Sequence, residues 1–142
     1  MIAVISTAND LHYQSVAAEL RRMGEESFLV EIPKLGNQAR FTMATGGERY
    51  QKWSIPGHDT LDLEQVRCVW YRRFFPPVLT PTLSSKADTE WALREWRDAT
   101  TAAFSASPAR FVSAPWAQEL AGMKAYQLRV AQSLGLRVPD TL

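Results

Sequence analysis

Two clusters of polar residues hold the side chains of this sequence that could do chemistry. Tyr71, Arg72 and Arg73 follow an apolar run, and Ser-Thr-Ala-Asn-Asp (residues 6–10) follows another. Two adjacent guanidinium groups can hold a carboxylate or a phosphate through paired hydrogen bonds. In the alternative interpretation, one arginine pairs with Asp10 or another nearby carboxylate and the other arginine is solvated. Helix capping would likewise account for residues 6–10. The binding candidates are therefore Tyr71, Arg72, Arg73 and Asp10.

The remaining reactive side chains do not form a recognisable catalytic or metal site. His12 and His58 lie far apart and lack neighbours of the metal-ligand type, so both are expected in loops or on the surface. The single cysteine, Cys68, excludes an internal disulfide framework, and its place within an apolar run predicts a buried, unreactive thiol. No glycine occurs in residues 6–12, and no Walker A sequence occurs in the chain. The sequence predicts no catalytic residue and no metal ligand.

Bulk composition narrows the classes of partner. The 142 residues carry a formal net charge of +1, so nothing suggests the basic surface that nucleic acids require. No apolar run approaches the roughly 20 residues that cross a membrane. A soluble cytoplasmic protein with neither nucleic-acid nor membrane partners is expected.

The elements that must position the polar clusters follow a strand–helix–strand pattern. Residues 2–5 are a continuous apolar run, which is typical of a strand buried on both faces. Asn9 or Asp10 can cap a helix that ends at Gly24, and residues 28–32 form a second strand ended by Pro33. This order predicts a right-handed crossover and a parallel pair of strands. One side of the helix is apolar: Tyr13, Val16, Ala17 and Leu20.

The middle of the chain predicts a hairpin followed by a third strand of the parallel sheet. Residues 39–45 and 48–55 flank Gly46-Gly47, a dipeptide suited to a tight turn. Pairing across that turn would set Met43 opposite Tyr50 and Phe41 opposite Lys52. Residues 66–71 predict a strand that is largely buried on both faces.

Helical patterns dominate the last third. Ser85 followed by Asp88 resembles a capping box, and Pro108 ends the helix that it begins. Residues 111–112 predict a short strand, and Pro115 can begin another helix. Two apolar stripes are expected to be buried: Trp91, Ala92, Trp96, Ala99 and Ala103 on the first helix, and Met123, Tyr126, Val130 and Leu134 on the last.

Together these elements predict an α/β fold, a small three-layer sandwich with a mostly parallel sheet and an inserted β-hairpin. In such a sheet ligands bind at the carboxyl ends of the strands. Both polar clusters follow strands, so this edge is where we expect them to meet.

Three stretches resemble one enzyme family. KAYQLRVAQSLGLRVPDTL (residues 124–142) resembles the passage that joins the N-terminal domain of ATP-grasp ligases to their catalytic core. VWYRR (residues 69–73) and FVSAP (residues 111–115) are similar to the microviridin-type branch, whose members form ester or amide links in ribosomal peptides. The chain departs from the branch at Ala114, where histidine is frequent, and at Phe74-Phe75 after the arginine pair.

The resemblance implies a pre-ATP-grasp domain over residues 1–122 and a connecting helix with an extended passage over residues 123–142. It implies ATP and magnesium as cofactors of the full-length enzyme, with neither expected to bind this chain tightly. Lys124 matches the early lysine that these ligases direct at nucleotide phosphates. The implied reaction activates a peptide carboxylate as an acyl phosphate, which a hydroxyl or amine then displaces. The implied partners are the missing C-terminal ATP-grasp domain and a precursor peptide.

Two other functions fit the same residues. The chain could be a free-standing module that binds a peptide or a partner subunit, for example by adding a strand to a hairpin edge. It could also be a structural dimerisation domain, and a homodimer is compatible with each function. Lys124 itself fits a solvent-exposed lysine near a helix start equally well from its spacing alone.

Overall fold

The computed structural model describes residues 1–36, 39–44, 50–54, 60–79, 83 and 85–140. They form two compact units, Met1–Val112 and Ser113–Leu142, and each unit is described by itself. Gly46, Gly47 and His58 lie outside the described residues.

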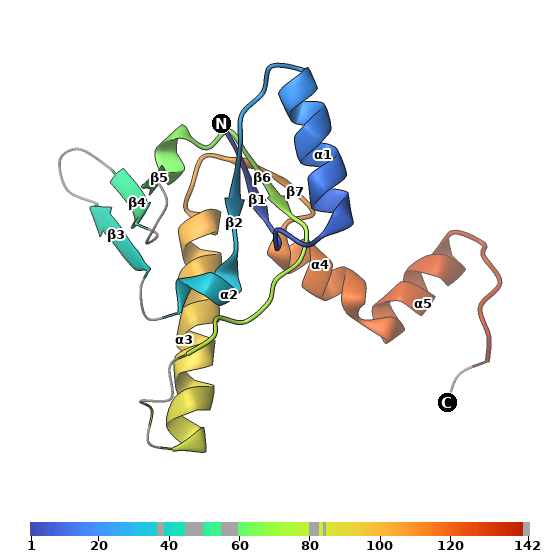
Figure 1. The fold of residues 1–142 in the computed structure, drawn as a ribbon. Coiled ribbons are helices and arrows are strands. Elements are labelled where there is room, and N and C mark those ends of the chain that lie inside the picture. Colours follow the sequence, from blue (N-terminus) through green and yellow to red (C-terminus); the bar gives the residue numbers. More distant parts are fainter. Residues whose placement is uncertain (37–38, 45–49, 55–59, 80–82, 84, 141–142) are drawn as a thin grey trace. The chain divides into compact units, whose positions relative to one another are not determined.

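The first unit is built on a parallel sheet of four strands in the order β2-β1-β6-β7 (Figure 1). The strands are β1 (Ile2–Ile5), β2 (Ser27–Val30), β6 (Cys68–Tyr71) and β7 (Arg110–Val112). β1 pairs in parallel with both β2 and β6, which confirms the crossover predicted from the first 32 residues. Since β1 is central, its residues 3–5 are almost completely buried.

Helices cover both faces of this sheet, so the predicted three-layer sandwich is confirmed (Figure 1). Ala3 and Ile5 belong to the main core cluster together with Ala103 and Phe104 of α3 (Lys86–Ser105). Side chains alternate along a strand, so Val4 points to the opposite face, where α1 (Leu11–Arg22) lies.

A second sheet of three antiparallel strands stands apart from the parallel one. Its order is β3-β4-β5, from β3 (Arg40–Ala44), β4 (Tyr50–Ser54) and β5 (Leu61–Asp62), followed by a 3₁₀ turn at Leu63–Gln65. Trp53 of β4 makes an edge-on contact with Phe104, with ring centroids 5.1 Å apart. This contact ties the hairpin to the core of the first unit.

The hairpin exists, but its predicted register was wrong by one residue. Phe41 pairs with Trp53 instead of Lys52, and Met43 pairs with Gln51 instead of Tyr50. A shift by one residue exchanges the two faces of a strand, and only the observed register pairs Phe41 with the buried Trp53.

Burial on α3 also differs from the predicted stripe. Ser85 caps the helix as predicted, accepting from the backbone N–H of Asp88. Trp91, however, is 59% exposed, and Ala99 is exposed as well. The buried residues are Thr100, Ala103 and Phe104, so only the C-terminal part of the helix packs on the sheet. A helix of 20 residues spans about 30 Å, longer than a four-residue strand of about 13 Å, so its first turns extend past the sheet.

Two smaller expectations about strands need correction. The second strand ends at Val30, and residues 32–35 form the short helix α2 (Ile32–Leu35) with Pro33 in its first turn. A proline at this position is favourable because its missing N–H is not needed there. β6 is buried at Val69 and Tyr71, whereas Cys68 and Trp70 on its other face are only half-buried.

The second unit consists of α4 (Pro115–Gly122) and α5 (Lys124–Ser133), followed by a tail. Pro115 begins α4 as predicted. The prediction of a buried stripe on the last helix was wrong, because Met123, Tyr126, Val130 and Leu134 are all exposed and α5 has no buried residue. Among the described helices, none is long and apolar enough to cross a membrane.

Candidate functional site

The loop after β1 is held in place from both sides. Asp10 caps α1 through its side chain, which accepts from the backbone N–H of His12 at 2.9 Å. The backbone N–H of Asp10 donates to the carbonyl of Thr7 at 3.0 Å, closing a turn. The backbone N–H of Ala8 donates to Glu31 Oε1 at 2.8 Å, which ties the loop to the residue after β2. The loop is therefore fixed at the carboxyl edge of the sheet.

The arginine pair reaches the same edge through the backbone of β1. The N–H groups of Arg72 and Arg73 both donate to the carbonyl of Ile5, at 3.1 and 3.0 Å. Ser6 follows Ile5 directly, so the end of β6 lies beside the start of the loop. The structure thus brings the two sequence clusters together, as strand order predicted.

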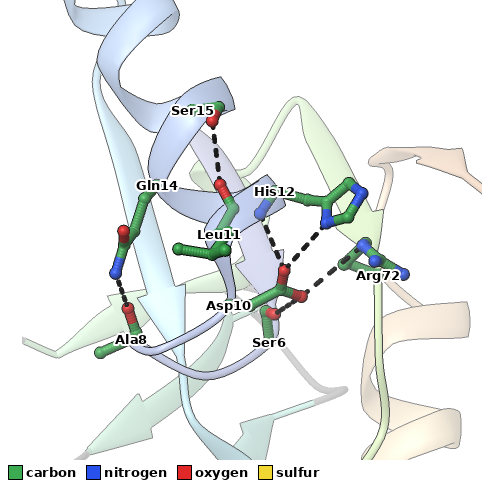
Figure 2. Close-up of polar contacts among 8 residues, drawn as sticks. All are labelled: Ser6, Ala8, Asp10, Leu11, His12, Gln14, Ser15 and Arg72. Carbon is green, nitrogen blue, oxygen red and sulfur yellow. Dashed lines mark hydrogen bonds and ion pairs between the residues drawn. The ribbon is translucent and has the colours of Figure 1, made fainter.

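Asp10 lies at the centre of the contacts between the clusters (Figure 2). Its Oδ2 accepts from Ser6 Oγ at 2.8 Å and lies 3.6 Å from Arg72 Nε. Its Oδ1 is 3.5 Å from Nδ1 of His12, in addition to accepting from the His12 backbone. The Asp10 side chain is only 7% exposed, and that of Arg72 is 23% exposed. The ion pair considered from the sequence is therefore present and largely shielded.

These contacts favour the ionised form of Asp10. The hydrogen bond from Ser6 is the largest cause that lowers the pKa of the Asp10 carboxyl, and the backbone N–H of His12 and the charge of Arg72 lower it further. Desolvation acts in the opposite direction, but the net direction is downward. Asp10 is thus a carboxylate at neutral pH, facing a guanidinium.

The other two candidates of this cluster have different surroundings. Tyr71 is buried and stacks on Phe74, with ring centroids 6.2 Å apart and planes 13° apart. Its ring therefore belongs to the core. Arg73 is exposed, and within the described part of the chain its side chain has no ion-pair partner. Arg72 and Arg73 thus provide one paired and one unpaired cation at the edge.

Lys124 lies in the second unit, at the first residue of α5. It is exposed, and its Nζ donates to Gln127 Oε1 at 3.1 Å. This is a contact one turn along the same helix. Packing does not fix where the ammonium group points.

The described residues do not fit a magnesium–nucleotide site on their own. Within the parts of the chain that the structure describes, no three His, Cys, Asp or Glu side chains are grouped to hold a metal ion. Magnesium bound with nucleotide phosphates usually needs one or two carboxylates directed at it, and the carboxylate of Asp10 is already engaged by Ser6 and Arg72.

Sequence reasoning missed two residues of this site. It treated Ser6 as a possible cap, whereas Ser6 is buried and donates to Asp10. It did not consider Glu31, which holds Ala8 from the neighbouring strand end. Both residues come directly after strands of the parallel sheet and so lie at its carboxyl edge. That position is the feature by which they could have been found.

Comparison with known proteins places this fold. No protein-family model matches the chain, and no curated protein matches it. Among solved structures, it is similar to macrocyclase MdnB from Microcystis aeruginosa MRC, with 27% identity and a TM-score of 0.82. It is similar to macrocyclase MdnC of the same organism, bound with precursor peptide MdnA, with 23% identity and a TM-score of 0.87. A third match is a RiPP-associated ATP-grasp ligase from Chryseobacterium gregarium in complex with ADP and a leader and core peptide, with 19% identity and a TM-score of 0.77.

These similarities cover 99% of this chain but only 43–46% of the matched chains, so the chain spans less than half of their length. The fold is shared with part of the macrocyclases and RiPP-associated ATP-grasp ligases, consistent with the N-terminal domain of such enzymes. The resemblance that the three sequence stretches indicated is confirmed at this level.

Proposed function

We propose that this chain is the N-terminal domain of an ATP-dependent carboxylate ligase that forms ester or amide crosslinks in a ribosomal peptide. The observation that supports this most is the similarity to MdnB over 99% of the chain at 27% identity. The carboxyl edge of the parallel sheet adds chemical support, because it presents a shielded arginine next to an unpaired one.

In the proposed reaction, a carboxylate oxygen of the peptide attacks the γ-phosphorus of ATP and ADP leaves, giving an acyl phosphate. A hydroxyl or amine of the same peptide then attacks the acyl carbon, and phosphate leaves. The part of this chain is to bind and orient the carboxylate through Arg72 and Arg73, whose guanidinium groups suit paired hydrogen bonds to two oxygens. Tyr71 supports them from the core by packing under Phe74.

The same proposal assigns nucleotide and metal binding mainly to a further ATP-grasp domain. Lys124 is the one side chain of this chain that we assign to the nucleotide, as a flexible point charge directed at a phosphate. The second unit supports binding of a partner domain, because α4, α5 and the residues that flank them expose many apolar side chains. These are Trp116, Leu120, Met123, Tyr126, Val130 and Leu134.

The test is reconstitution of the ligase. The gene region that encodes this chain is expressed together with the reading frame that continues it, and the product is incubated with ATP, magnesium and the neighbouring precursor peptide. We expect mass spectrometry to show the loss of one water per bond formed. Hydroxylamine added during the reaction should give a peptide hydroxamate, because it intercepts an acyl phosphate.

Two results would contradict the proposal. If the reading frame encodes no further domain and the chain binds the peptide without changing its mass, the chain is a free-standing binding module. If ATP is consumed without a change in the peptide, the substrate class is wrong.

A further inference from the structure

Asp10 contacts Arg72 from one side only. The ion pair joins Asp10 Oδ2 to Nε of Arg72, the nitrogen nearest the aliphatic stem. Among the described residues, the two terminal nitrogens of the guanidinium group have no hydrogen-bond partner. These two terminal nitrogens are therefore the part of Arg72 that can bind a ligand.

The position of Asp10 is set by hydrogen bonds from the backbone of His12 and the side chain of Ser6. Its Oδ1 caps α1 and its Oδ2 accepts from the buried Ser6, so both oxygens are held independently of Arg72. A carboxylate fixed in this way keeps a negative charge 3.6 Å from Nε and so restricts where the guanidinium group of Arg72 can lie. Pre-ordering a long side chain lowers the entropy lost when a ligand binds.

Asp10 also sets the charge of the edge. The carboxylate of Asp10 offsets one of the two guanidinium charges, and Glu31 at the same edge is paired with Lys34. The edge therefore carries one net positive charge. One positive charge matches a single carboxylate better than a phosphate dianion. Removal of the Asp10 charge would leave two positive charges and favour the dianion.

We propose that Asp10 is a positioning residue. It orients Arg72 so that the terminal nitrogens face a single ligand carboxylate, and its charge makes the carboxyl edge of the sheet bind a carboxylate more tightly than a phosphate. This deepens the proposed function, because it assigns how the substrate carboxylate is chosen. Asp10 itself then makes no contact with the substrate.

The first test uses the 142-residue chain and requires no catalysis. Asp10→Asn removes the charge but keeps an acceptor that caps helices as well as aspartate does, so α1 should remain folded. Glu25→Gln is the matched control, because Glu25 pairs with Arg67 away from this edge. We expect the Nε–H NMR signal of Arg72 to exchange faster in Asp10→Asn than in the unmodified chain and in Glu25→Gln, because only Asp10→Asn removes the carboxylate that lies 3.6 Å from Nε.

Titration with acetate and with inorganic phosphate tests the selectivity on the same signals. We expect acetate to perturb Arg72 at lower concentration than phosphate does in the unmodified chain, and the order to reverse in Asp10→Asn. Equal Arg72 exchange in all three proteins, or an unchanged order of the two anions, would overturn the inference.

The second test uses the full-length ligase. We expect Asp10→Asn to raise KM for the peptide about tenfold while kcat changes less than about twofold, because orientation of the carboxylate is a binding effect. A fall in kcat at constant KM would contradict a positioning role. If the unmodified enzyme forms no crosslinks, the proposed function fails, and the measurements on the 142-residue chain still decide the role of Asp10.

Discussion

The two basic sites of this chain differ in how they are held. Arg72 is attached to the centre of a buried sheet, pairs with Asp10 and is mostly shielded from solvent. Lys124 begins a helix with no buried residue, and its ammonium group donates a hydrogen bond to a glutamine one turn away. The side chain of Arg72 is held by contacts within its own unit, whereas no packing contact among the described residues of its unit fixes the side chain of Lys124.

The comparison separates two kinds of proposed binding residue. At the carboxyl edge, the fold itself fixes the charges, so a substitution should act on ligand choice and on stability together. At Lys124, local structure leaves the side chain free to reach a phosphate, so a substitution should act on ligand binding alone. The predictions below test this difference, beginning with the largest expected effect.

The first unit should contain most of the folding free energy. Phe104 is fully buried and contacts Trp53, so Phe104→Ala should lower the free energy of unfolding by about 3–5 kcal/mol. Leu134→Ala is the control in the second unit: its side chain is 71% exposed, and the expected change is within about 0.5 kcal/mol. Urea unfolding measures both, and similar losses would erase the contrast between the units.

The segment after the arginine pair should depend on a glycine. Gly36 has φ of +33°, and a Cβ there would lie 2.6 Å from the carbonyl oxygen of Val78. Gly36→Ala should therefore cost about 2 kcal/mol or more, because backbone strain and a backbone clash combine. Gly24→Ala, with φ of +75° but open space around it, should cost only about 1 kcal/mol. If thermal unfolding ranks the two variants in the opposite order, the backbone at Val78 can move away from the added Cβ at little cost in stability.

The contacts of Asp10 with Ser6, His12 and Arg72 should make the free energy of unfolding depend on pH. The pKa of Asp10 is lowered below its ordinary value of 3.8, first by the Ser6 hydroxyl, so its contribution is complete above that value and is lost as pH falls through the folded pKa. We therefore expect Asp10→Asn to be less stable than the unmodified chain at about pH 7, and the difference to shrink as the pH falls below 3.8 toward the folded pKa. A difference that stays constant over this range would mean that the charge of Asp10 does not stabilise the fold.

The smallest expected signal is nucleotide binding by the chain alone. Among the described residues no three His, Cys, Asp or Glu side chains are grouped to hold a metal ion, and titration calorimetry should give a Kd for Mg-ATP weaker than about 1 mM. Binding tighter than that, and dependent on magnesium, would show that the nucleotide site is complete within these residues.

Much of this fold and part of the site could be predicted from sequence. Local signals were sufficient for the helix starts at Ser85 and Pro115, and they narrowed the cap of α1 to Asn9 or Asp10, because a helix start depends on a few adjacent residues. They were not sufficient for the hairpin register, which depends on the packing of Phe41 against Trp53 of the neighbouring strand and of Trp53 against Phe104 of the distant helix α3.

The exposed stripe on the last helix illustrates the opposite failure. Its spacing identified apolar residues, but spacing does not reveal whether such residues are buried within their own unit. The contact of Asp10 with Arg72 was considered from sequence because both follow strands. The contribution of Ser6 required coordinates, because a serine after a strand has several possible acceptors.

The most direct test of the account compares two variants of the full-length ligase: the double variant Arg72→Ala/Arg73→Ala and the single variant Lys124→Ala. The Michaelis constants for the peptide and for ATP are measured in each. We predict that the arginine substitutions raise KM for the peptide by at least about tenfold and leave KM for ATP unchanged, as expected when bidentate contacts to a carboxylate are lost. We predict the reverse for Lys124→Ala, with an unchanged melting temperature. If the arginine variant processes the peptide with an unchanged KM, the carboxyl edge of this sheet is not the carboxylate site, and the central claim is wrong.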